Sequence, residues 1–462
     1  MRLIKLPHIM CFGLCLAING CASMQFGDLF STYSQQLTPT RQLINANQPQ
    51  QALTTLSQHT KGSNNYLVSL LEHAKTAHFA KNYAHSETVF AEVIDILKQE
   101  ELKAAIQISN TTQHISALVT NDTALEYTLP YYEQVMVHHY QALNYLYMNN
   151  IESAVIEARK AYQVQQRALK DQELDLVNQQ LTQSVTLDSL SNTYAELDRI
   201  IGNDLKGIDN PYTAVLSAIL LESADEANNA YISYQSALAL NPTNAYLQQQ
   251  VERLSSQLGI EEHSTLGNKG IHDSDNQLIV LIEQSLIPKK QEQNINLPIY
   301  TSQGEMRFYS VALPSYSQAQ PSVPISISLN GSNLNSQPLV DFQALAAANL
   351  KQIMPTLIAR QTARLIAKEQ VRKKLAKEGG DVGNVLATLY NIASERADTR
   401  SWLTLPANAQ IITSPLSDNT DELLVHYRGH SHAVAINPKH QGVTLVTIYT
   451  ADQLFNVETS YL

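Results

Sequence analysis

The chain has 462 residues, a formal net charge of −11 at pH 7 and a hydrophobic content of 44%. The acidic balance argues against general nucleic-acid binding, and the length predicts two or three domains. All three cysteines lie within the first 21 residues, so the sequence after Cys21 excludes cysteine catalysis, disulfides and Cys-ligated metal sites.

The first 20 residues predict an export signal. Arg2 and Lys5 form a short positive segment, a largely apolar run follows over 9–18, and Gly20 precedes Cys21. This order is typical of a signal peptide, and the run is too short for a spanning helix, which needs roughly 20 residues. We expect 1–20 to be a lipoprotein signal peptide cut after Gly20. The alternative is an ordinary secretory signal with an incidental cysteine.

The four residues Ile18-Asn19-Gly20-Cys21 resemble the lipobox of bacterial lipoproteins. The resemblance implies that Cys21 is acylated, with palmitate-type chains, so that membrane lipid is a partner; two or three chains make such an anchor durable. Ala22 stands where that family's sorting rule uses Asp for inner-membrane retention, which implies the outer membrane, facing the periplasm. The polar residues of 21–40 are then a lipidated tether.

Residues 41–260 predict a helical repeat domain, because apolar residues recur at three- and four-residue spacing with few Pro or Gly. One stretch matches the second half of a tetratricopeptide repeat, which has small, aromatic, small and Pro residues at offsets 0, +4, +7 and +12. The signature residues are Ala230, Tyr234, Ala237 and Pro242, with partial copies at Ala154, Ala158 and Ala161 and at Ser86, Phe90 and Val93.

The copies keep a repeat register. Ser86 lies 34 residues after Ala52, Ala154 lies 68 after Ser86, and Ala230 lies 76 after Ala154. These separations are one repeat length, two lengths, and two lengths plus eight. A generic amphipathic bundle is the alternative, and the number of regular repeats between 95 and 210 is open.

Beyond a Gly-containing linker at 261–276, period-two alternation and turn residues predict strands. We expect them at 277–285, 307–313, 323–329, 409–412, 422–427, 432–436 and 443–450. Two helices are expected between the two groups of strands. The first covers 341–377, where Pro355 kinks or divides it, and the second ends near Arg396. The expected fold is mostly α: a tetratricopeptide-like α-solenoid, then a smaller α+β domain over 277–462 with an antiparallel sheet.

Three groups of residues could carry chemistry. His426, His430 and His432 could face one way and bind a metal, but Gly429 favours a hairpin turn and no carboxylate completes a ligand set. We therefore expect no metal and no cofactor.

The segment 396–406 contains Trp402, the only tryptophan of the chain, together with Asp398 and Arg400. A buried corner, with Asp398 bonded to backbone amides or to Arg400, is the favoured interpretation. An exposed aromatic–arginine interaction site is the alternative.

A basic stripe follows one side of the helix predicted over 341–377. It consists of Arg360, Arg364, Lys368 and Arg372. Such a stripe could meet lipid headgroups, anionic glycan or an acidic partner, although a solvated face is the commoner explanation.

The segments His139–Leu146, Glu157–Lys160 and Ala397–Trp402, with the lipobox and the repeats, resemble a little-studied family of proteobacterial lipoproteins. The resemblance implies helical repeats before a mixed C-terminal domain, and no settled activity.

We therefore expect a non-enzymatic scaffold that is anchored in the membrane and binds another cell-envelope protein through a repeat groove, in cell-wall or outer-membrane assembly. No nucleic acid and no small-molecule substrate are expected. The alternatives are an envelope enzyme, or a glycan or lipid-headgroup binder, with its site in the C-terminal domain.

Overall fold

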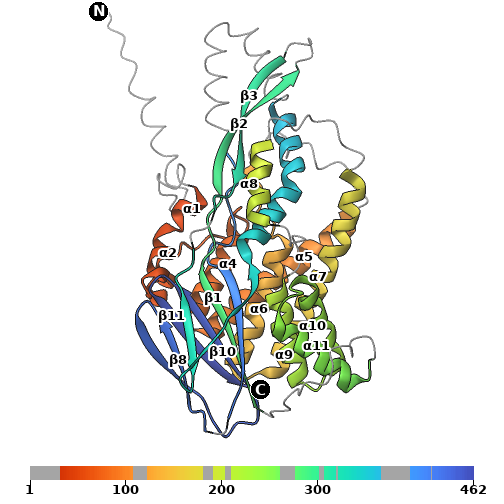
Figure 1. Cartoon of the computed structure of the whole chain (residues 1–462). Helices are drawn as coiled ribbons and strands as arrows, with labels where there is room; N and C mark the ends of the chain where they lie inside the picture. The colour runs from red at the N-terminus through yellow and green to blue at the C-terminus, as the bar shows by residue number, and fades with distance from the viewer. Residues whose placement is uncertain are drawn as a thin grey trace, which may run out of the picture.

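The computed structural model describes residues 32–107, 122–179, 191–202, 210–260, 276–300, 306–318, 321–365, 396–417 and 419–462. The signal peptide, the lipobox with Cys21 and most of the tether lie outside these ranges. So do Lys368 and Arg372. A helical N-terminal part precedes a sheet-containing C-terminal part (Figure 1).

The helical part is built from antiparallel helix hairpins. Its helices are α1 (Tyr33–Gln36), α2 (Thr38–Asn45), α3 (Pro49–Thr55), α4 (Tyr66–Phe79), α5 (Tyr83–Gln107), α6 (Tyr131–Tyr147), α7 (Ile151–Gln179), α8 (Ser191–Ile201), α9 (Pro211–Ser223), α10 (Ala227–Leu240) and α11 (Ala245–Leu258). A short 3-10 helix, η1 (Asp122–Ala124), lies between α5 and α6.

Four hairpins share one turn geometry: α2/α3, α4/α5, α6/α7 and α9/α10. Each turn contains one residue with a φ of 57° to 60°, namely Asn47, Lys81, Asn149 and Asp225. The next residue donates its N–H to the carbonyl five residues earlier, at 2.8 or 2.9 Å in all four turns. This bond satisfies a carbonyl at the end of the first helix and reverses the chain. The same local chemistry therefore closes each hairpin.

The repeat register found in the sequence is the register of these turns. Ala52, Ser86, Ala154 and Ala230 each lie five residues after the left-handed position, and all four are fully buried. A small side chain there lets the second helix approach the first; in the second hairpin the Ser86 hydroxyl donates to the Ala74 carbonyl at 2.8 Å. The other signature residues, apart from the exposed Pro242 that follows α10, are also buried: Phe90, Val93, Ala158, Ala161, Tyr234 and Ala237.

The C-terminal part contains two larger sheets and a hairpin. Its strands are β1 (Asn276–Leu286), β2 (Gln291–Tyr300), β3 (Met306–Ser315), β4 (Ile325–Leu329), β5 (Ser332–Leu334), β6 (Gln337–Asp341), β7 (Pro406–Pro415), β8 (Glu422–Tyr427), β9 (His430–Ala435), β10 (Gly442–Ala451) and β11 (Leu454–Tyr461). One sheet has the order β11-β10-β1-β7-β6, the second has the order β5-β4-β8-β9, and β2 pairs with β3.

The five-stranded sheet is mixed, which corrects the expectation of an antiparallel sheet. β1 pairs with β10 in parallel, from Asn276 opposite Gly442 to Gln284 opposite Thr450, whereas its other neighbour β7 is antiparallel. Parallel neighbours need a long connection, and this one spans most of the C-terminal part. Local alternation could not reveal a pairing between strands so far apart in sequence.

The predicted strands all overlap observed ones, and β2, β5, β6 and β11 were not predicted. A helix occupies 342–365 and continues through Pro355, so the helix is not divided at that proline. The second predicted helix, ending near Arg396, lies outside the described residues.

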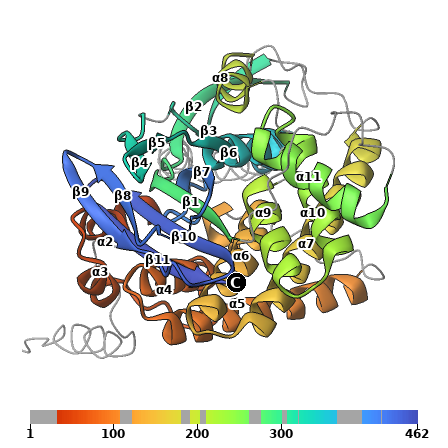
Figure 2. The same cartoon turned by 60° about the horizontal axis from the view of Figure 1, so that its bottom comes forward.

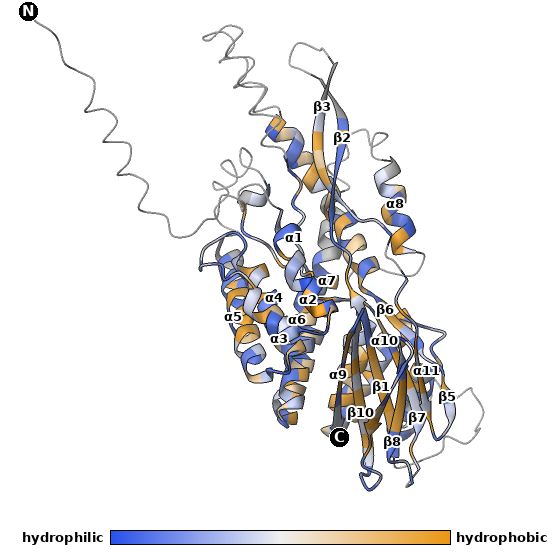
Figure 3. Ribbon diagram, turned by 90° about the vertical axis from the view of Figure 1, so that its left-hand side faces the viewer, coloured by the Kyte–Doolittle hydropathy of each residue, from blue (hydrophilic) through white to orange (hydrophobic). Residues whose placement is uncertain are grey.

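The strand β1 is buried on both faces. Leu278, Val280 and Ile282 pack against the four-stranded sheet, where they meet Ile327 and Val425. The alternate residues belong to a second cluster that includes residues of α4, α6 and α9. A strand covered on both sides reads as a continuous apolar run, as 278–282 does, and Figure 3 shows such apolar stretches in the packed strands.

The helices form an arc around the five-stranded sheet (Figure 2). One hydrophobic cluster runs without interruption from the helices into the sheet; it includes Leu71, Leu143, Leu281 and Leu445. In the described part of the chain, no helix combines the length and apolar character needed to cross a membrane.

Candidate functional site

The inner side of the helical arc is covered by the chain's own C-terminal part. The first helix of each hairpin provides much of the contact: α2, α4, α6 and α9. In α2, the Asn45 carbonyl accepts the N–H of Gln453 at 2.8 Å. In α4, the Phe79 carbonyl accepts a bond from the Asn456 amide at 2.7 Å. The second helices lie further out, so the arc surrounds the sheet (Figure 2).

A buried ion pair lies at the centre of this contact. Lys75 of α4 and Glu283 of β1 are 3.1 Å apart between Nζ and Oε2, and their side chains are 0% and 3% exposed. The hydroxyls of Tyr140 in α6 and Tyr212 in α9 donate to Glu283 at 3.0 and 3.1 Å. Three helices of three hairpins thus converge on one carboxylate of the sheet.

The lysine also has aromatic partners. Its Nζ lies 3.5 Å from the ring centroid of Tyr140, 4.3 Å from that of Phe79 and 4.6 Å from that of Tyr449 in β10. Burial lowers the pKa of Lys75 to about 8, and the Glu283 carboxylate opposes this shift. The ion pair and the ring faces replace the water that the ammonium loses.

A neutral histidine lies next to the ion pair. Burial and the nearby Lys75 hold the pKa of His78 well below its ordinary value. Its Nδ1 donates to Asn144 Oδ1 at 2.7 Å, and its Nε2 accepts from the Tyr449 hydroxyl at 3.0 Å. Tyr147 of α6 bonds to the Tyr449 hydroxyl at 2.8 Å, which extends the network to the edge of the arc.

Two buried carboxylates hold the segment that leads into β7. Glu72 of α4 accepts the N–H groups of Leu403 at 2.6 Å and Thr404 at 3.1 Å. Glu133 of α6 accepts the N–H of Trp402 at 3.0 Å and the Tyr127 hydroxyl at 2.8 Å. These donors satisfy the oxygens of two fully buried side chains.

Burial raises the pKa of both of these acids. It raises the pKa of Glu72 to about 7, against the opposing effect of its two backbone bonds and of Arg41. It also raises the pKa of Glu133, which its bonds from Trp402 and Tyr127 oppose. Their role in the structure is that of caps for an extended segment.

Arg400 joins the same segment to the connection between α5 and α6. Its guanidinium donates to the carbonyls of Asn64, Leu125 and Asp122 at 2.9 to 3.2 Å. It also makes a bidentate pair with Asp398, at 2.9 and 2.6 Å. These bonds use all five N–H groups of the side chain.

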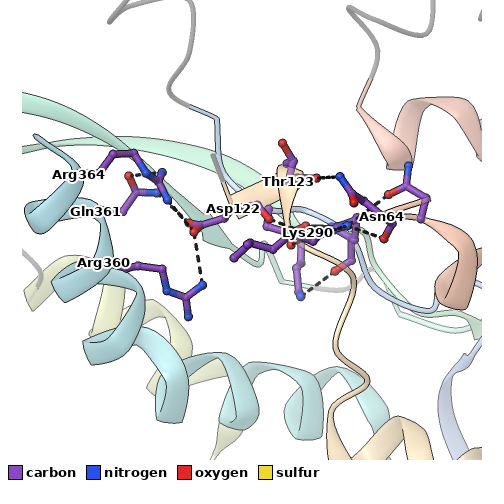
Figure 4. Close-up of polar contacts among 11 residues, drawn as sticks. Asn64, Asp122, Thr123, Lys290, Arg360, Gln361 and Arg364 are labelled. Atoms are coloured by element: carbon purple, nitrogen blue, oxygen red, sulfur yellow. Dashed lines mark hydrogen bonds and ion pairs between the residues drawn. The ribbon is translucent and has the colours of Figure 1, made fainter. Parts of the chain in front are cut away.

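The Asp122 carboxylate beside it binds the helix over 342–365. Arg364 Nη2 donates to it at 2.8 Å, Gln361 at 3.1 Å and Arg360 at 3.4 Å (Figure 4). Arg364 is 1% exposed at its side chain, whereas Arg360 is 32% exposed. The predicted basic stripe is corrected here, because Arg364 points inward and forms part of a buried ion pair.

The distinctive 396–406 segment is a buried corner. Trp402 is completely buried and contacts the rings of Phe90 and Tyr140, and its indole N–H donates to Thr404 at 2.9 Å. The exposed interaction site that Asp398, Arg400 and Trp402 could have formed is not present at these positions. The sequence patterns did not single out four buried ionisable residues: Lys75, Glu72, Glu133 and Glu283. The feature that could have indicated them is a charged residue within an apolar run.

The histidine group lies on the β8–β9 hairpin, as the turn interpretation predicted. Arg428 and Gly429 form its turn with φ values of 52° and 78°. His432 stacks on Phe455 at 4.0 Å between centroids, and His426 Nδ1 contacts the Ser431 hydroxyl at 2.8 Å. Within the described ranges, no group of three His, Cys, Asp or Glu side chains could hold a metal ion.

The outer helices expose large apolar side chains. Ile156 and Tyr162 of α7 are 42% and 37% exposed, and Ile232 of α10 is 43% exposed. The two helices are linked by an ion pair between Arg159 and Glu226. In the described structure, these three side chains are thus among the large apolar residues that remain exposed.

Comparisons with known proteins find little similarity. No family model matches the chain, and no curated protein matches it. A solved structure, the TPR2AB-domain:pHSP90-complex of yeast Sti1, aligns over 49% of this chain and 83% of that one, with 8% identity and a TM-score of 0.20.

Proposed function

We propose that the protein is a lipid-anchored scaffold of the bacterial outer membrane, facing the periplasm, that binds another cell-envelope protein through a tetratricopeptide-like helical repeat. The observation that carries the proposal is the four-fold recurrence of one hairpin, with the same left-handed turn and the same buried small residue. Stacked hairpins of this kind build extended binding surfaces. The lipobox resemblance at Cys21 supports the anchor.

The partner surface differs from the groove expected from the sequence. Because the inner side holds the five-stranded sheet, we place the partner on the outer face of α7 and α10, around Ile156, Tyr162 and Ile232. Exposed aromatic and aliphatic residues beside a charged pair are typical of interaction surfaces.

We propose a non-catalytic role. Both oxygens of Asp398 accept bonds from Arg400, so this carboxylate is already occupied. The buried acids Glu72 and Glu133 bond to backbone N–H groups of the chain itself.

Site-specific crosslinking in intact cells tests the proposal. A photoreactive phenylalanine at Ile156 or Ile232 is expected to give one defined adduct with an envelope protein, identified by mass spectrometry. The same residue at the exposed Lys439 of the β-sheet part is the matched control. Cys21→Ser is expected to remove the adduct, because the chain then leaves the membrane.

Two results would contradict the proposal. Equal adducts from Ile156 and Lys439 would show non-specific proximity. An adduct that persists after Cys21→Ser would show that partner binding does not need the anchor.

A further inference from the structure

A cavity of about 390 Å³ lies beside the Asp122 ion pairs. The segment 122–130, the strand β3, the helix over 342–365 and residues 398–400 enclose it. Its size falls in the range of about 300 to 1,000 Å³ that is usual for sites of small organic ligands.

One wall of the cavity is apolar. Leu350, Ile353 and Leu357 follow one face of the helix over 342–365, and Leu313 of β3 also contributes. Ile353 is 38% exposed, so a large apolar side chain faces solvent at the mouth of the cavity. This wall suits an aliphatic or aromatic ligand body.

The polar lining contains as many acids as cations: Asp122, Glu126 and Asp398, with Lys290, Arg360 and Arg400. Arg364, which pairs with Asp122, lies outside this lining.

The cations of the cavity differ in how many of their N–H donors are used. Arg364 and Gln361 bind Asp122, and Arg400 binds Asp398 with both oxygens, so these groups satisfy one another. Among the described residues, the acceptor of Arg360 is Asp122 at 3.4 Å, and that of Lys290 is the Arg400 carbonyl at 2.9 Å.

Both cations therefore retain donors for a ligand. Figure 4 shows Arg360 and Lys290 on different elements near Asp122, where Arg360 reaches the Asp122 carboxylate and the Lys290 ammonium reaches a backbone carbonyl. A guanidinium and an ammonium that line one cavity can each donate to a ligand carboxylate.

We infer that this cavity, defined by Lys290, Arg360 and the Leu350–Ile353–Leu357 wall, binds a small amphipathic monoanion: a carboxylate on an apolar body, such as a medium-chain fatty acid. The inference is independent of the proposed scaffold, because the cavity and the α7/α10 face use different elements.

Fluorescence titration of the mature chain carrying Cys21→Ser, with dansyl-labelled undecanoate as the probe, tests this site. We expect saturable binding, displacement by decanoate and no displacement by 1-decanol at equal concentration. Arg360→Gln and Lys290→Gln are each expected to weaken binding about tenfold, because each removes one charge-assisted bond. Arg199→Gln, on the exposed surface of α8, is the matched control and leaves binding unchanged.

Ile353→Trp gives a second, independent test. The side chain is exposed, so the variant keeps the core intact, and the larger ring fills the mouth of the cavity and is expected to abolish binding. The inference is overturned by absence of saturable binding, by equal competition from 1-decanol, or by undiminished binding in a folded Ile353→Trp variant. Loss of the crosslinked partner at Ile156 would leave these results untouched.

Discussion

At the residue scale, the contact between helices and sheet depends on ionisable groups in fully buried positions. Lys75 and Glu283 form an ion pair inside a ring of tyrosines. A buried pair of this kind contributes little net stability relative to an apolar pair, but removing one partner leaves an uncompensated charge. The pair therefore fixes how the helices dock on β1.

Lys75→Met is expected to lower the free energy of unfolding by about 3 to 5 kcal/mol, because it leaves Glu283 buried without its cation. The double variant Lys75→Met with Glu283→Gln should lose clearly less than the sum of the two single variants. Urea unfolding measures both. Lys98→Met, in an exposed pair with Asp95 on α5, is the control and should change stability by less than about 1 kcal/mol. Additive losses would show that the pair is not coupled.

Glu72 should make stability depend on pH. Its folded-state pKa of about 7 exceeds the ordinary value of 4.5, so the folded state binds the proton more tightly. The tighter proton binding adds to the free energy of unfolding. This added stability is fully present below pH 4.5 and is lost as the pH rises through 7. Glu72→Gln should be less stable than the native chain at pH 5, because glutamine has only one oxygen to accept the two backbone N–H groups. Between pH 5 and pH 8, its deficit relative to the native chain should shrink by roughly 2 kcal/mol.

Unfolding curves at pH 5, 6, 7 and 8 measure this difference. The matched control is Glu152→Gln at the exposed start of α7, which makes the same exchange outside the bonds to the segment before β7 and should not reproduce the deficit at pH 5. A deficit of Glu72→Gln that does not change with pH would contradict the raised pKa.

At the element scale, the helix hairpin is the unit of the N-terminal part. Its turn needs a left-handed residue, and at four positions the chain uses Asn, Lys or Asp in place of Gly. Asn and Asp tolerate that conformation better than most side chains, because they can bond to the local backbone. The hairpin is thus specified within about ten residues of sequence, which is why its register was visible without a structure.

Asp225→Val should lower the free energy of unfolding by about 1 to 2 kcal/mol, because a β-branched side chain opposes the left-handed conformation at the α9/α10 turn. Asp225→Gly should be neutral or slightly stabilising, since Gly adopts this φ without strain. Thermal unfolding compares the two. The control Gln163→Val, on the exposed face of α7, should cost only a few tenths of a kcal/mol. Equal effects of Val and Gly at 225 would argue against the turn geometry.

At the scale of the whole molecule, the helices and the sheet share one hydrophobic cluster. The five-stranded sheet is covered by the four-stranded sheet on one face and by the helical arc on the other. The inner side of the arc is therefore buried against the chain's own sheet.

Residues 32–260 expressed alone are expected to aggregate or bind a hydrophobic dye, because the inner faces of α4, α6 and α9 lose their cover. Co-expression with residues 276–462 should restore a soluble complex of the two pieces, measured by co-purification through a tag on one of them. The same pair carrying Glu283→Arg is the control and should fail to associate. A soluble, monomeric and cooperatively unfolding 32–260 piece would contradict a shared core.

Some of this architecture was determined by sequence alone. The hairpin register follows from a turn and a small residue five positions later, and both are local. Strand segments such as 277–285 and 422–427 were visible because alternation and apolar runs report the burial of neighbouring residues. The turn at Arg428-Gly429 follows in the same way from local backbone preference.

Only the tertiary structure decided which distant segments meet. The parallel pairing of β1 with β10, the inward position of Arg364 and the burial of Arg400 and Trp402 depend on contacts between residues separated by more than 100 positions. A charged side chain looks the same in sequence whether it faces water or a buried carboxylate, because its environment comes from other elements. For that reason the sequence predicted a helical N-terminal part before a sheet-containing part, but only the packed structure revealed that the inner side of the helices holds the chain's own sheet.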